Sequence, residues 1–138
     1  MVFVEDILIG YFTVSTDRVR VEKQSKVNFK MKNHGNKVKL SSIPSISLHH
    51  FGIAHEYQGQ GIGRLVMDAF YFFIINFLLP YVGACLITTY ALKTSIGFYH
   101  KLGFEKIGSQ SRDNSSNRCM ALYISELLQA LNNPENVD

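Results

Sequence analysis

A glycine-rich stretch in the middle of the chain has the composition of an anion-binding turn. It reads Gln58-Gly59-Gln60-Gly61-Ile62-Gly63 and leads into a long apolar segment. Glycines at the start of a helix let a ligand approach the backbone closely. The first-turn N–H groups lack partners within the helix, and with the helix dipole they favour a diphosphate. The stretch therefore predicts a loop that binds a phosphorylated cofactor.

The spacing of the glycines excludes two common phosphate motifs. Arg64-Leu65-Val66 follows Gly63, so the pattern Gly-x-Gly-x-x-Gly of dinucleotide-binding folds is absent. The chain also lacks the Gly-Lys-Ser/Thr of nucleotide hydrolases. On the glycines alone, an ordinary tight turn is the alternative, and the surrounding elements have to decide.

The chain before the loop predicts three strands. Ile7–Ser15 is rich in β-forming residues, Thr16-Asp17 suits a turn, and Arg18–Glu22 alternates as a returning strand would. A polar, basic stretch over residues 24–42 predicts a long loop or a ragged hairpin. Ile43–Ala54 then predicts a strand that leads directly to the glycines.

The chain after the loop alternates helix and strand. We expect helices over Ile62–Leu79, ended by Pro80, and over Thr94–Leu102, closed by Gly103. The expected strands are Ala84–Tyr90, Phe104–Ile107 and Arg118–Ile124. Ser125 is the expected cap of a short terminal helix. The order β-β-β-α-β-α-β-β predicts an α/β protein with a mixed sheet and helices packed on it.

Composition and charge narrow the class of protein. With 138 residues, of which 46% are hydrophobic and 18% charged, the chain suits one folded domain over 1–138. Ala69–Leu92 carries no charge over 24 residues, long enough to span a bilayer. Asn76, Pro80 and Gly83 interrupt it, so a helix followed by a buried strand is the favoured interpretation and no membrane association is expected.

Two further features bear on partners and location. Residues 18–39 hold eight basic residues and one acid, net +7, so the rest of the chain is −4. This basic segment could meet RNA, or it could be a solvated loop. Cys85 and Cys119 lie in apolar runs and suggest buried thiols of a reduced, cytoplasmic protein, and no residue spacing suggests a metal site.

The loop together with its context resembles a known family. The segment Phe51–Gly63 resembles motif A of the GNAT superfamily of N-acetyltransferases, whose core Arg/Gln-x-x-Gly-x-Gly/Ala is met by Gln58, Gly61 and Gly63. Gly97–Phe104 (Gly-Phe-Tyr-His-Lys-Leu-Gly-Phe) resembles the second signature of that family, Phe-Tyr-x-x-Leu-Gly-Phe. The resemblance covers residues 7–124 and implies a mostly antiparallel sheet, splayed at the cofactor site, with flanking helices.

The resemblance implies roles for individual residues. The amides of Gln58, Gly59, Gln60, Gly61, Ile62 and Gly63 would hold the diphosphate of acetyl-CoA. The backbone of Phe51 and Ile53 would hydrogen-bond the pantetheine arm, and a backbone N–H there could stabilise an oxyanion. Tyr99 matches the family's general acid, which protonates the departing CoA thiolate. The alternative is that Tyr99 is a packing residue.

A primary amine acts as the acceptor in this family and must arrive neutral, so a base is expected. An imidazole with a pKa near 6.5 suits that task, and His49 and His50 lie on the strand before the loop. Because consecutive strand residues point to opposite faces, at most one of the two should face the site, and His50 is our candidate. Glu56 is a weaker candidate, and a purely structural histidine is the alternative.

Two departures from the family pattern leave the function open. The first hairpin begins near residue 7, where family members usually have a strand and two helices first, so a short variant or a fragment is expected. Leu92 stands where many members place a cofactor-contacting Asn.

The leading prediction is an acetyl-CoA-dependent N-acetyltransferase acting on a small-molecule or protein amine. The alternatives are an acetyltransferase similar to toxins that modify aminoacyl-tRNA, and a non-catalytic acyl-CoA-binding domain. Apolar surface left by missing helices would favour a homodimer.

Overall fold

The sheet is mixed and has six strands. The computed structural model describes residues 1–20, 42–107 and 117–132. Its strands are β1 (Val2–Val4), β2 (Ile7–Arg20), β3 (Ser42–Ile53), β4 (Leu86–Ala91), β5 (Glu105–Lys106) and β6 (Arg118–Tyr123). They lie in the order β1-β2-β3-β4-β6-β5, and every pair is antiparallel except β3 and β4. The predicted mixed, mostly antiparallel sheet is confirmed.

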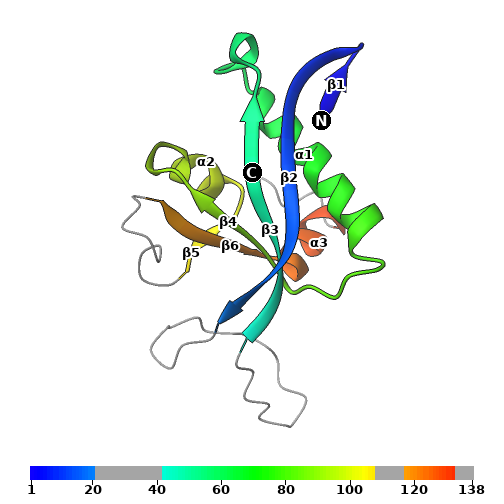
Figure 1. Cartoon of the computed structure of the whole chain (residues 1–138), viewed down its shortest axis with the longest axis vertical. Helices are drawn as coiled ribbons and strands as arrows, with labels where there is room; N and C mark the ends of the chain where they lie inside the picture. Colours follow the sequence, from blue (N-terminus) through cyan, green and yellow to red (C-terminus); the bar gives the residue numbers. More distant parts are fainter. Residues whose placement is uncertain (21–41, 108–116, 133–138) are drawn as a thin grey trace.

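Three α-helices accompany the sheet (Figure 1). They are α1 (Ile62–Phe73), α2 (Ile96–Lys101) and α3 (Ile124–Asn132), with a π-helical turn η2 (Ile74–Leu78) extending α1 and 3-10 turns η1 (His55–Tyr57) and η3 (Lys93–Ser95). The predicted long helix is confirmed as α1 with η2, and it stops before Pro80. Within the described ranges, no helix is both long and apolar enough to cross a membrane.

One core joins all three helices to one face of the sheet. Met67 and Phe70 of α1 are fully buried, together with Leu48 of β3 and Ile87 of β4. Tyr99 of α2 belongs to the same cluster. Because strand side chains alternate, the neighbours of Leu48 and Ile87 point to the opposite face. The apolar side chains of the two central strands thus hold α1 and α2 on the same side of the sheet.

The N-terminal part of the sheet differs from the prediction. The expected turn at Thr16-Asp17 is wrong, because β2 runs without a break and pairs Thr16 with Ile46 and Asp17 with Ser45. Continuous pairing with β3 outweighs the local preference of Thr-Asp for a turn. The real reversal lies earlier, at Glu5-Asp6, whose positive φ values of 47° and 64° join β1 to β2. The strand β1 was not predicted.

Of the two helix caps predicted for α2 and α3, one is confirmed and one is wrong. Gly103 closes α2 as predicted, with a φ of 87°. Its N–H bonds to the His100 carbonyl at 3.1 Å, and Phe104 N–H bonds to the Tyr99 carbonyl at 3.1 Å, the pair of a Schellman motif. Ser125 does not cap α3, because the helix already begins at Ile124, directly after β6.

Candidate active site at a splayed pair of strands

Among the described strands, β3 and β4 form the only parallel pair, and this pair opens part-way along its length. The two strands pair from Ser45 and Leu86 as far as Leu48 and Thr89. Beyond that point β3 continues beside β2 to Ile53, and β4 continues beside β6 (Figure 1). At the point of divergence Thr89 Oγ1 donates a hydrogen bond to the Leu48 carbonyl at 3.1 Å. The predicted splay is confirmed, and it starts at a defined hydrogen bond.

The glycine loop lies between the end of β3 and the start of α1. Gly59 and Gly61 have φ values of 74° and 80°, a left-handed conformation that side chains rarely adopt. The first bond of the helix runs from Arg64 N–H to the Gly61 carbonyl at 3.0 Å. The amides of Ile62 and Gly63 precede this bond, so the helix leaves them free to bind an anion.

Two glutamines hold the loop in this shape. Gln58 Nε2 donates to the Ile53 carbonyl at 3.0 Å, and Gln60 Nε2 donates to the Glu56 carbonyl at 2.8 Å. The loop is open on its outer side, since no atom lies within 4 Å of where a Cβ would stand on Gly59 or Gly61. A phosphate could therefore approach the backbone there, and the residues present fit a diphosphate group.

An aromatic cluster closes the inner side of the loop. A Cβ on Gly63 would stand 3.3 Å from the Phe98 ring. Ring centroids lie 5.7 Å apart for Phe51 and Phe98, 6.5 Å for Phe51 and Tyr99, and 5.3 Å for Phe98 and Tyr99. The cluster links β3 to α2 and brings the predicted residues Phe51 and Tyr99 together. The sequence assigned no role to Phe98, although it stands in the second signature.

Tyr99 is held in its protonated form. Its side chain is 6% exposed, and burial raises the pKa of the phenol, while the Thr89 hydroxyl acts in the opposite direction. A tyrosine of ordinary pKa is already protonated in the neutral range, and burial strengthens that preference. Because Thr89 also bonds to Leu48, Tyr99 is tied to the point where the strands diverge.

Both histidines of β3 lie on one face of the sheet, whereas strand alternation predicts opposite faces for them. The β2–β3 register pairs Thr13 with His50 and Val14 with Leu48, so His49 is an extra residue in the strand. Such a bulge interrupts the alternation of side chains. His50 Nδ1 lies 2.8 Å from Thr13 Oγ1, and His49 Nε2 lies 2.7 Å from Ser15 Oγ.

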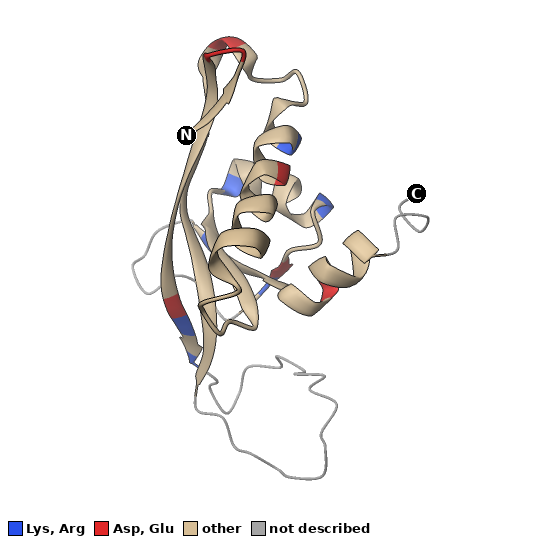
Figure 2. Cartoon of the chain, turned by 90° about the vertical axis from the view of Figure 1, so that its right-hand side faces the viewer, with Lys and Arg blue, Asp and Glu red and all other residues tan. Residues whose placement is uncertain are grey.

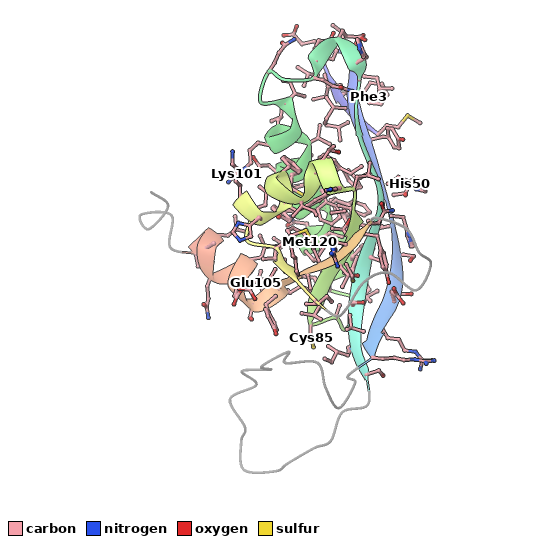
Figure 3. The ribbon with its side chains drawn as sticks, turned by 90° about the vertical axis from the view of Figure 1, so that its left-hand side faces the viewer. Phe3, His50, Cys85, Lys101, Glu105 and Met120 are labelled. Carbon is pink, nitrogen blue, oxygen red and sulfur yellow. The ribbon has the colours of Figure 1, made fainter. Side chains whose placement is uncertain are left out.

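The face that carries the two histidines is opposite to the one that carries Tyr99. Phe51, next to His50, belongs to the core beneath α1 and α2, whereas His50 is exposed. Figure 3 shows His50 on the side of the strands that faces away from these helices. His50 and Tyr99 are therefore not in contact, and the strand β3 separates them at the splay.

The remaining candidate residues contribute less to this arrangement. Glu56 and Leu92 are exposed, and Leu92 brings no polar group to the cofactor side. Arg18 is exposed near the end of β2, while most of the basic segment over 18–39 lies outside the described residues (Figure 2). Burial raises the pKa of the Cys119 thiol. Within residues 1–20, 42–107 and 117–132, no cluster of three metal-binding side chains occurs.

Comparison with known proteins agrees with this geometry. Residues 9–106, more than half of the chain, match the acetyltransferase (GNAT) domain. The chain belongs to the GNAT acetyltransferase family. The predicted family, fold and acetyl-CoA-dependent type of enzyme are thereby confirmed. Among curated proteins, none matches the chain in sequence.

Solved structures with this GNAT fold include several toxins. A bacterial toxin superposes with a TM-score of 0.73 and 22% identity, over 94% of this chain and 68% of its own. AtaTR bound with acetyl-CoA superposes with a TM-score of 0.66 and 22% identity, over 89% of this chain and 66% of its own. AtaT complexed with acetyl-methionyl-tRNAfMet superposes with a TM-score of 0.66 and 19% identity, over 89% of this chain and 66% of its own. The chain thus spans about two thirds of the length of these structures.

Proposed function

We propose that this GNAT domain transfers the acetyl group of acetyl-CoA to the amino group of an aminoacyl-tRNA. Acetyl-CoA as the acetyl donor is supported by the open glycine loop at the start of α1, beside the splay. The amides of Ile62 and Gly63 are free to bind the diphosphate there. The backbone of Phe51 and Ile53 lines the splay and is assigned to the pantetheine arm. The Ile53 carbonyl, which accepts a hydrogen bond from Gln58 Nε2, would accept one from the pantetheine arm instead.

Tyr99 and His50 divide the proton transfers between them in this proposal. Attack by an amine on a thioester expels a thiolate, so the acceptor must lose a proton and the leaving sulfur must gain one. Tyr99 donates from the buried side, where its pKa is raised. His50 accepts from the exposed side, where a large acceptor can approach. In the tetrahedral adduct the amine and the thiolate are bonded to the same carbon, and the two side chains would reach these groups from opposite faces of β3.

The choice of acceptor rests on charge and on likeness. Residues 18–39 carry net +7, which would attract a polyanion such as tRNA. One protein of the same fold is known in complex with an acetylated aminoacyl-tRNA. A small-molecule amine or a protein amine is the second candidate, because the family signature alone does not distinguish among amines.

Two further properties belong to this proposal. We place the domain in the reducing cytoplasm, where Cys85 and Cys119 remain free thiols as they are in the structure. A homodimer is expected because Phe3 and Ile7, at 55% and 51% exposure, leave apolar surface on the β1–β2 hairpin. Light scattering at several concentrations measures this directly, and a single monomeric mass throughout would contradict it.

Calorimetry with acetyl-CoA tests the first half of the proposal. Wild type should bind, and Gly61→Glu should not, because the new carboxylate would crowd and repel the diphosphate. Gly83→Glu is the matched control, since Gly83 also has open space around it but lies outside the loop. A folded wild type that binds no acetyl-CoA would leave a non-catalytic domain as the better description.

The acceptor is tested by following radiolabelled acetyl transfer. Charged tRNA should become labelled, whereas uncharged tRNA should not, because it lacks the amino group. Replacement of four lysines by alanine should remove salt-sensitive tRNA binding without affecting acetyl-CoA binding. These residues are Lys30, Lys32, Lys37 and Lys39. If free amines or a protein become labelled and charged tRNA does not, a small-molecule or protein amine is the better candidate for the acceptor.

A further inference from the structure

The bulge at His49 places an exposed hydroxyl against each histidine of β3. Thr13 and Ser15 are two residues apart on β2, so their side chains share one face. They lie 2.8 Å from His50 Nδ1 and 2.7 Å from His49 Nε2, respectively. The two histidines therefore differ in which ring nitrogen is engaged. Within residues 1–20, 42–107 and 117–132, no side chain bonds to Nε2 of His50 or to Nδ1 of His49.

The bonds of Thr13 determine what His50 can do. Thr13 Oγ1 accepts a hydrogen bond from the His50 backbone N–H at 3.2 Å. A hydroxyl has one donor and two acceptor positions, so it can either accept from Nδ1–H or donate to a bare Nδ1. In the first arrangement, Nε2 of neutral His50 carries a lone pair. In the second, Nε2 carries the proton and cannot act as a base.

We propose that Thr13 is a positioning residue that accepts the Nδ1–H of His50 and thereby presents a bare Nε2 to the acceptor amine. This inference rests on the proposed function. The arrangement has a chemical advantage, because the bond from Nδ1–H to Thr13 is the same before and after Nε2 takes up the proton. The opposite arrangement would have to break its bond, or rotate the hydroxyl, in every reaction cycle.

The backbone bond between the same two residues fixes the orientation of the His50 ring. Because the backbone N–H of His50 also donates to Thr13 Oγ1, two contacts fix the Thr13 hydroxyl relative to the His50 imidazole. The ring is thereby oriented at the edge of the splay, although it is exposed to solvent. A free exposed histidine would sample several rotamers, and few of them would point Nε2 at an acceptor.

The tautomer is measured without reference to activity. Long-range proton–nitrogen spectra of the wild-type protein at mildly alkaline pH report which ring nitrogen of each histidine carries the proton. We expect Nδ1–H for His50 and no such preference in Thr13→Val. A wild-type spectrum in which His50 carries its proton on Nε2 would overturn the proposal, whatever the enzyme does.

Kinetics then distinguish positioning from mere packing. Thr13→Val should lower kcat about tenfold, the effect of one lost hydrogen bond, with KM for acetyl-CoA unchanged. Thr13→Ser should restore the rate, and Ser15→Ala, which alters only the partner of His49, should leave it unchanged. Thr13→Val at the wild-type rate would refute the positioning role. If His50→Gln is fully active, the general base of the proposed function falls instead, while the tautomer result stands by itself.

Discussion

Replacement of Gly61 by alanine separates the backbone strain of the loop from its role in binding. Gly61 has a φ of 80°, and a side chain in this left-handed conformation costs about 1–2 kcal/mol. No atom lies within 4 Å of the new Cβ, so packing adds no cost. Alanine also restricts the unfolded chain, which returns about 0.4–1 kcal/mol. The expected loss in free energy of unfolding is therefore about 1 kcal/mol, a fall in Tm of about 2–6 °C.

Binding should suffer at least as much as stability. The methyl group would stand in the open space beside the amides of Ile62 and Gly63, where the diphosphate is proposed to lie. We expect acetyl-CoA affinity to fall at least tenfold, which corresponds to about 1.4 kcal/mol. Calorimetry gives the affinity, and thermal unfolding followed by circular dichroism gives the stability of the same preparation.

Two further variants make the reasoning refutable. Gly61→Asn should be less destabilised than Gly61→Ala, because asparagine tolerates this conformation better, yet it should bind no better. Gly83→Ala has open space and no positive φ, so both its stability and its affinity should match wild type. If Gly61→Ala binds acetyl-CoA as wild type does, the loop is not the diphosphate site.

Three other substitutions, and one control, test the packing of the fold and the proposed acid. Tyr99→Phe should lower kcat about 10²–10⁴-fold at unchanged acetyl-CoA affinity; an unchanged kcat would mean that another group protonates the thiolate. The hydroxyl of Tyr71 is buried and has no hydrogen-bond partner among the described residues, so Tyr71→Phe should stabilise the fold by about 1 kcal/mol in denaturant unfolding. Burial raises the pKa of Tyr71 far above its usual value of 10.0, so the unfolded chain loses that proton first; stability should fall above that pH, and less steeply in Tyr71→Phe. Gly10→Ala would place a Cβ 2.7 Å from the Gly52 carbonyl oxygen and should cost about 1–3 kcal/mol, whereas Gly97→Ala, with nothing within 4 Å, should fold normally.

Local chemistry was sufficient to predict several features from the sequence alone. The glycine loop, the start of α1 at Ile62 and the end of α2 at Gly103 depend on backbone freedom and on hydrogen bonds between near neighbours in the chain. The apolar run after Ile62 indicated the buried helix, and Pro80 marked its end. The two signatures around Gly61 and Tyr99 indicated the family, and neither needed knowledge of what lies opposite in space.

Contacts between distant residues decided the rest. Thr16-Asp17 resembles a turn locally, but eleven residues of β2 pair with β3 across this point and keep it extended. The sequence could not show the bulge at His49, because a bulge exists only in the register between two strands. That register turned two histidines that alternation would separate into neighbours on one face, next to Thr13 and Ser15. The amino-acid sequence therefore determined which groups could do chemistry, and the pairing of β2 with β3 decided on which face of the sheet the two histidines lie.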